Sequence, residues 1–148
     1  MKDLFLKNWK ESRTRFEVLL KEITERDLTK KLGNSPNSLG YYIRHVADVE
    51  LLFAKNIFKL EDVKVTAKTV IKNEDTGEWT SLEELITYNN YAKNKLEEAI
   101  KSFPDENWND EVTTKEFGTK SMAEAFGRIT SHTAYHAGQM AITLKYGN

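Results

Sequence analysis

The 148-residue chain contains no cysteine, and this absence removes several kinds of site at once. Disulfide bonds, thiolate zinc sites and cysteine nucleophiles all require that side chain. An excess of either charge is also lacking, because 22 basic and 23 acidic residues leave a formal net charge of −1. A chain so balanced lacks the electrostatic footprint of a nucleic-acid-binding protein, so we expect no nucleic-acid partner.

Long hydrophobic runs are missing as well. No stretch approaches the roughly 20 apolar residues that span a bilayer, and the first residues lack the apolar core of a signal peptide. We therefore expect a cytoplasmic protein with no membrane partner. The chain length suits one ordinary domain, and we expect residues 1–148 to form a single domain.

Proline is rare, and both prolines, Pro36 and Pro104, fall where helical patterns break. Apolar residues recur at helical spacing elsewhere, which predicts four amphipathic helices. Their expected ranges are residues 3–26, 38–60, 81–103 and 121–146. Ser81–Glu84 and Ser121–Glu124 are capping boxes at the starts of the last two helices. Residues 108–119 contain β-prone residues and a glycine, which predict a small irregular hairpin.

The connection between the second and third helices is long. Residues 61–80 show no helical periodicity, although Val63 and Val65 could form a short extended piece. Such a link can run the length of a helix of about 30 Å, so the two helices that it joins can be parallel. The sequence therefore predicts an all-α four-helix bundle with up-down-down-up topology and a long crossover between helices 2 and 3.

The chain has three histidines, and their placement is the most informative feature of the sequence. His132 and His136 lie four residues apart on the last predicted helix, so both imidazoles leave the same face one turn apart. Such a pair can chelate one metal ion. His45 lies midway along the second predicted helix, and it would complete a set of three nitrogen ligands with open coordination positions.

Polar residues near the histidines could orient these ligands. Tyr41 and Asp48 lie four residues before and three residues after His45, and Gln139 continues the polar stripe of the last helix. Glu50 lies nearer the opposite side of its helix, and we leave it out of the site. Imidazole suits zinc and nickel, so we expect one divalent ion, zinc or nickel. The alternative is that the histidines are hydrogen-bonded core residues without a metal.

Other catalytic motifs are excluded by the residues around the histidines. A di-iron carboxylate bundle needs glutamate three residues before a histidine, where this chain has Tyr42, Ile129 and Thr133. A zincin needs glutamate directly after the first histidine of the pair, and position 133 is threonine. The chain also has no phosphate-binding glycine loop and no GxSxG elbow.

At these residues the sequence resembles the DinB/YfiT-like family of metal-binding four-helix bundles. The resemblance covers nearly the whole chain and rests on Ser38–His45, Ser121–Glu124 and His132–Gln139. It implies that the three histidines correspond to the metal triad of the family.

The resemblance also implies a homodimer, because members of the family often form one. In addition, Trp79, Trp108 and Phe117 fall in predicted loops or at helix ends, where a partner subunit could cover them.

Two kinds of function remain open at this point. The resemblance implies a metal-dependent enzyme, of the thiol S-transferase or hydrolase type, that acts on a small-molecule substrate. An open position on a three-histidine metal is consistent with either reaction. The alternative is a non-catalytic, dimeric bundle that binds a metal or a small molecule.

Overall fold

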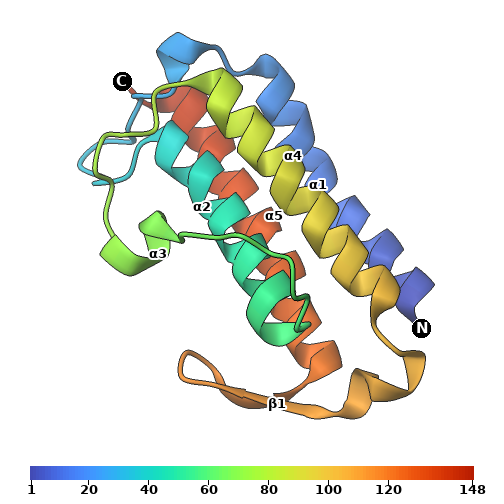
Figure 1. Cartoon of the computed structure of the whole chain (residues 1–148). Coiled ribbons are helices and arrows are strands. Elements are labelled where there is room, and N and C mark those ends of the chain that lie inside the picture. Colours follow the sequence, from blue (N-terminus) through green and yellow to red (C-terminus); the bar gives the residue numbers. More distant parts are fainter.

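The structure is a computed structural model that describes all 148 residues. Four long helices make up most of it, and their bounds are Lys2–Glu22 (α1), Leu39–Leu52 (α2), Leu82–Ser102 (α4) and Met122–Tyr146 (α5). Helices α1 and α5 run in one direction, and α2 and α4 run in the other (Figure 1). The predicted all-α four-helix bundle with up-down-down-up topology is confirmed.

The packing of the helices brings the middle of α2 against the middle of α5. Helix α1 packs mainly against α5, and α2 packs mainly against α4; α2 and α5 are also neighbours. Helices α2 and α5 are antiparallel, and α2 lies alongside the middle of α5 (Figure 1). This region carries His45 on α2, and His132 and His136 on α5.

The start of each of the last two helices is fixed by a serine. Ser121 Oγ accepts a hydrogen bond from the Glu124 backbone N–H over 3.2 Å, and the Glu124 carboxylate accepts from the Ser121 N–H over 2.8 Å. This capping box is complete, as predicted. At α4 only half of the predicted box forms: Ser81 Oγ accepts from the Glu84 N–H over 3.4 Å, and the Glu84 carboxylate does not reach back.

Two helices end earlier than the sequence predicts. Helix α1 stops at Glu22, and a separate 3₁₀ turn follows at Glu25–Asp27. At the start of this 3₁₀ turn, the Asp27 carboxylate accepts a hydrogen bond from the Thr24 N–H over 2.9 Å. This side-chain bond to the backbone competes with continuation of α1. After α2, a π-helical turn spans Phe53–Ile57, and Lys59 then adopts a left-handed φ of 61° that ends the helical path.

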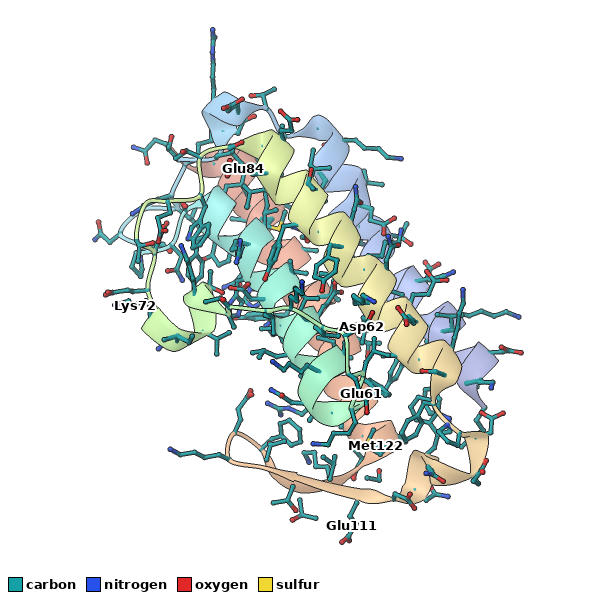
Figure 2. All side chains as sticks on the ribbon, viewed as in Figure 1. Glu61, Asp62, Lys72, Glu84, Glu111 and Met122 are labelled. Carbon is teal, nitrogen blue, oxygen red and sulfur yellow. The ribbon has the colours of Figure 1, made fainter.

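The crossover contains a helix that the sequence does not predict. Lys68–Lys72 form α3, which lies beside α2 (Figure 1), and Figure 2 labels Lys72 at its end. Val63 and Val65 belong to no strand, and Val63 packs into the core instead.

The predicted hairpin is confirmed. Strands β1 (Glu111–Thr114) and β2 (Gly118–Ser121) are antiparallel, with Val112 opposite Lys120. Figure 2 labels Glu111 at the start of β1 and Met122 at the start of α5, so the hairpin leads directly into the last helix.

The core consists of two apolar clusters stacked along the bundle. One surrounds Trp108 and contains Ala47, Leu51 and Ile129, and the other surrounds Leu39 and contains Ala137. The histidines lie near the junction: on α5, His132 and His136 fall between Ile129 of the first cluster and Ala137 of the second, and on α2, His45 lies just before the change from the second cluster to the first at Ala47.

Two of the aromatic residues that a partner subunit was expected to cover are buried within their own chain. Trp108 is fully buried, and Trp79 is 8% exposed. Phe117 is half-buried against Phe53 and Arg128. Loops and helix ends of the same chain therefore cover Trp79 and Trp108, which leaves little of these two side chains for a partner subunit to cover.

Every helix is too short or too polar to cross a bilayer.

Candidate metal centre

The three histidines converge on one another between α2 and α5. Nε2 of His132 lies 3.2 Å from Nε2 of His45 and 3.1 Å from Nε2 of His136. One ring nitrogen of each lies within 4.8 Å of the others, and all three side chains are half-buried. The structure thus brings together the three residues that the sequence singles out, as a group that could hold a metal ion.

The Nδ1 side of the His45 ring contacts Thr69 of α3. Its Nδ1 lies 3.1 Å from the Thr69 hydroxyl oxygen, and that hydroxyl lies 2.7 Å from Oδ2 of Asp48. On another side, the ring of Tyr41 stacks on the His45 ring, with the centroids 5.6 Å apart and 9° between the planes. Tyr41 therefore contacts the site with its ring, whereas Asp48 reaches His45 only through Thr69.

His136 is held by Gln139, one turn further along α5. The Nδ1 atom of His136 lies 2.6 Å from Oε1 of Gln139. An amide oxygen can only accept, so His136 carries its proton on Nδ1 and directs the lone pair of Nε2 toward His132. The rings of Tyr42 and Tyr135 flank His136, with centroid separations of 5.8 and 5.1 Å. Gln139 thus lies where it can orient the His136 ring.

His132 has the least support of the three. Its Nδ1 is buried and has no hydrogen-bond partner, while its Nε2 faces both other histidines. A buried polar atom without a partner is costly in a folded protein. The protein alone therefore leaves the hydrogen bonding of this cluster incomplete.

Burial keeps the three imidazoles neutral. Burial, together with the nearby His136 and His45, lowers the pKa of His132 to about 3. Burial and His45 lower the pKa of His136 to about 4, although the hydrogen bond to Gln139 acts in the opposite direction. Burial also lowers the pKa of His45, against the opposing effect of Asp48. Metal ligation needs neutral imidazole, and near pH 7 all three side chains are in that state.

The arrangement of the nitrogens fits a divalent metal ion. Tetrahedral zinc with zinc–imidazole bonds of about 2.0–2.1 Å places its ligand nitrogens about 3.3 Å apart, and the separations of 3.2 and 3.1 Å come close to this value. Nε2 of His132 carries at most one proton, so it cannot donate fully to both of its neighbours. A cation shared by the three lone pairs would remove that conflict.

Thr69 is the site residue that sequence reasoning misses. It is fully buried, and it lies in the crossover, where no periodic pattern points to it. Its place depends on Asp48, which also accepts hydrogen bonds from Arg44 Nε over 2.9 Å and from the Tyr88 hydroxyl over 2.8 Å. Arg44 belongs to α2 and Tyr88 to α4, so only the folded chain shows that both residues meet Thr69 at Asp48.

A second buried polar group lies at the same level of the bundle. The fully buried Glu50 pairs with Arg13 of α1, and it accepts from Trp9 Nε1 over 3.4 Å and from the Thr133 hydroxyl over 3.3 Å. Glu50 forms no hydrogen bond to His45. Its hydrogen bonds instead link α1, α2 and α5 beside His132.

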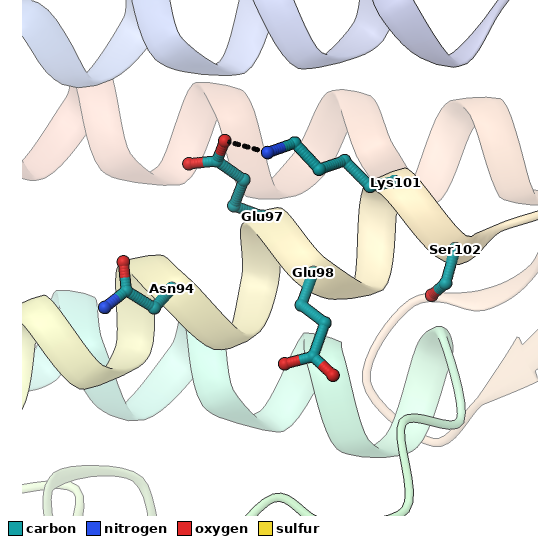
Figure 3. Close-up of a pocket in the computed structure, with 5 residues that line it drawn as sticks. All are labelled: Asn94, Glu97, Glu98, Lys101 and Ser102. Atoms are coloured by element: carbon teal, nitrogen blue, oxygen red, sulfur yellow. Dashed lines mark ion pairs between the residues drawn. The ribbon is translucent and has the colours of Figure 1, made fainter.

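A surface hollow on α4 lies apart from the histidines. Figure 3 shows its lining residues, which are Asn94, Glu97, Glu98, Lys101 and Ser102. Glu97 pairs with Lys101 over 2.7 Å and with Lys10 over 2.8 Å. Ligand sites combine an apolar lining with a few convergent polar groups, and this hollow has no hydrophobic residue. The histidine cluster therefore remains the candidate site.

Fold and site together define a class of protein: a four-helix bundle with a long crossover and a histidine cluster between its second and last long helices. The family model of the DinB superfamily matches residues 8–140, a range that includes all three histidines. The chain belongs to the DinB superfamily.

A solved structure supports the fold independently. The chain is similar to the crystal structure of a conserved protein from Enterococcus faecalis, with a TM-score of 0.67 and 14% sequence identity. The likeness covers 99% of this chain and 96% of that chain. At this identity it extends to the fold alone. A comparison with curated proteins finds no match.

Proposed function

We propose that this protein binds one divalent metal ion, zinc or nickel, through His45, His132 and His136. The observation that carries the proposal is the convergence of three neutral imidazoles inside the bundle. Nε2 of His132 lies 3.2 Å from Nε2 of His45 and 3.1 Å from Nε2 of His136. Zinc and nickel both accept imidazole ligands. Membership of the DinB superfamily supports the same assignment.

We further propose a metal-dependent enzyme of the thiol S-transferase or hydrolase type with a small-molecule substrate. Three protein ligands leave coordination positions open, and a divalent ion there supplies a Lewis acid that lowers the pKa of a thiol or a water molecule. The chain itself orients the site: Gln139 holds His136, and Tyr41 covers one side of His45. Tyr135 is 64% exposed beside His136; its hydroxyl oxygen accepts from Gln139 Nε2 over 3.4 Å, so its proton is free to be donated to a substrate.

A non-catalytic metal-binding or small-molecule-binding bundle is the second candidate, and one observation favours it. General-base catalysis needs a group that can take up a proton near the reacting atoms. Asp48 is the carboxylate linked to the cluster, and both of its oxygens already accept hydrogen bonds from Arg44, Tyr88 and Thr69. This carboxylate is therefore not free to act as a base.

Turnover separates the two candidates. Protein loaded with zinc or nickel is assayed against panels of thiol-transfer and hydrolysis substrates, beside metal-free protein and His136→Ala. An enzyme should show a rate that requires the metal, disappears in His136→Ala and falls in Tyr135→Phe. One bound ion per chain without a metal-dependent rate in either panel supports the non-catalytic bundle.

We also propose that the protein is a homodimer, and the face formed by α1 and α5 supports this. A groove there has a mixed lining: Val18, Leu19, Ala134, Ala137, Gly138 and Ala141 are small or apolar, and Asn8, Glu11, Ser12, Thr14 and Arg15 of α1 are polar. Val18 is 47% exposed, and Ile142 on α5 is 49% exposed. Burial of such side chains against a second copy would remove apolar surface from water.

A further inference from the structure

Asp48 gathers four hydrogen-bond donors although it is fully buried. Its Oδ1 accepts from Arg44 Nε over 2.9 Å and from the Tyr88 hydroxyl over 2.8 Å. Its Oδ2 accepts from the Thr69 backbone N–H over 3.1 Å and from the Thr69 hydroxyl over 2.7 Å. Arginine and backbone N–H groups can only donate, so the carboxylate acts as the acceptor of this network.

The direction of these bonds fixes the proton on His45. A threonine hydroxyl has one proton, and the short contact to Asp48 takes it. The Thr69 oxygen can then only accept from His45 Nδ1, which lies 3.1 Å away. His45 therefore carries its proton on Nδ1, and its Nε2 presents a lone pair to His132. Gln139 imposes the same tautomer on His136.

We propose that Thr69 is a positioning residue of the metal centre, which makes the crossover helix α3 part of that centre. The metal-dependent half of this inference rests on the proposed function. Thr69 holds the His45 ring with Nε2 free, and residues that fix a ligand in this way typically change metal affinity by about 10–100-fold when they are replaced.

The coupling between Thr69 and the metal site also acts from the metal toward α3. A metal at Nε2 selects the His45 tautomer that donates to Thr69, so metal binding should stabilise the docking of α3 on α2 by the same coupling free energy. The other polar contacts between these segments do not involve a histidine: the Thr69 N–H donates to Asp48 over 3.1 Å, the Tyr41 hydroxyl donates to the Thr69 carbonyl over 3.4 Å, and Arg44 donates to the Thr66 carbonyl over 3.4 Å. The Thr69 side chain is thus the main polar connection from α3 to the site.

The first test needs no metal. Long-range ¹H–¹⁵N NMR of the imidazole nitrogens in the metal-free protein should show His45 as the Nδ1–H tautomer. In Thr69→Val the population should shift toward Nε2–H, and Thr69→Ser should restore the wild-type pattern. An Nε2–H tautomer of His45 in the wild-type protein overturns the inference, whether or not the protein binds metal.

The second test measures zinc affinity by competition with a chromophoric chelator. We expect Thr69→Val to bind zinc about tenfold more weakly, and Thr69→Ser to stay close to wild type. Thr66→Val is the matched control, because Thr66 is exposed in the same crossover and should leave the affinity unchanged. A folded Thr69→Val that binds zinc as tightly as Thr66→Val shows that Thr69 is merely structural and overturns the proposal.

Hydrogen exchange of the wild-type protein covers the case in which Thr69→Val does not fold. Zinc should slow exchange of the amides in residues 66–72, above all that of Thr69, whose N–H is bonded to Asp48. Unchanged exchange in this segment with zinc bound contradicts the coupling. A wild-type protein that binds no zinc contradicts the proposed function, and the metal-free tautomer then decides the inference about Thr69.

Discussion

Arg13 and Glu50 form an ion pair inside the bundle, and Arg13 also pairs with the partly exposed Glu17 over 3.3 Å. Arg13 is 2% exposed and Glu50 is fully buried. Removal of one partner from a buried ion pair leaves an uncompensated charge, which costs about 3–5 kcal/mol. Replacement of both by apolar side chains of similar volume is often neutral. The pair is therefore expected to add little net stability, although the loss of one partner alone is costly.

The prediction for this pair is a contrast between single and double variants. Glu50→Leu should lower the free energy of unfolding by about 3 kcal/mol, because the buried Arg13 is left with only the partly exposed Glu17, 3.3 Å from its Nε, as a counter-charge. Arg13→Met combined with Glu50→Leu should recover most of that loss. Urea denaturation followed by circular dichroism measures both. A double variant that is no more stable than the single one would show that the charges themselves stabilise the fold.

The buried histidines make the free energy of unfolding depend on pH. An imidazole in the unfolded chain has a pKa of about 6.5, whereas the folded chain lowers that of His132 to about 3 and that of His136 to about 4. Between these values the unfolded state binds more protons, so stability is fully present above the unfolded pKa and is lost as the pH falls.

The metal-free protein should therefore become less stable from about pH 6 to about pH 5, by up to about 1.4 kcal/mol per pH unit for each histidine that stays neutral. His132→Gln should show a shallower decline over the same interval, since one of these groups is gone. Urea denaturation at several pH values gives the two slopes. Equal slopes would contradict the shifted pKa of His132.

At the scale of elements, the sequence predicts helices that are capped by their own neighbouring residues. It does not predict helices that are held by residues far away in the sequence. The helix at Met122–Tyr146 was predictable because Ser121 and Glu124 lie close in sequence and cap it without outside help. Helix α3 was not predictable, because it spans only Lys68–Lys72 and no side chain within it caps its start. Its Thr69 backbone N–H is bound instead by Asp48, 21 residues away. Short elements held by distant residues leave no periodic pattern in a sequence.

The two serine caps provide a matched comparison. Ser121→Ala removes the serine half of a complete capping box and should lower the free energy of unfolding by about 1 kcal/mol. Ser81→Ala removes only one hydrogen bond of 3.4 Å, so its effect should be smaller. Urea midpoints of the two variants and the wild type test this order. A larger loss for Ser81→Ala would mean that the cap geometry does not set helix stability here.

At the scale of the whole molecule, the ligand candidates could be predicted but their surroundings could not. His132 and His136 share a helix face, and His45 sits mid-helix, so spacing alone makes them a plausible group. Their true convergence depends on α2 and α5 being antiparallel neighbours at the same level, which only the fold shows (Figure 1). Thr69 and Tyr88 could not be predicted as parts of the site, because they contact His45 and Asp48 from other helices, α3 and α4.

The homodimer is testable on the face between α1 and α5. Light scattering at micromolar concentration should give twice the chain mass of 17.1 kDa. Val18→Lys places a charge on the exposed apolar face and should produce a monomer with unchanged helix content. Val70→Lys, on the exposed side of α3, is the control and should remain dimeric. A wild-type protein with the mass of one chain would reject the dimer.

The metal content of the purified protein tests the account most directly. Protein prepared without an affinity tag or a chelator is examined by elemental analysis, beside His132→Ala, His136→Ala and the control Ser131→Ala on the exposed side of α5. We expect about one zinc or nickel ion per chain in the wild type and the control. We expect none in the two histidine variants, which should keep their helical circular dichroism. Equal metal content in all four proteins would mean that these histidines are not the ligands.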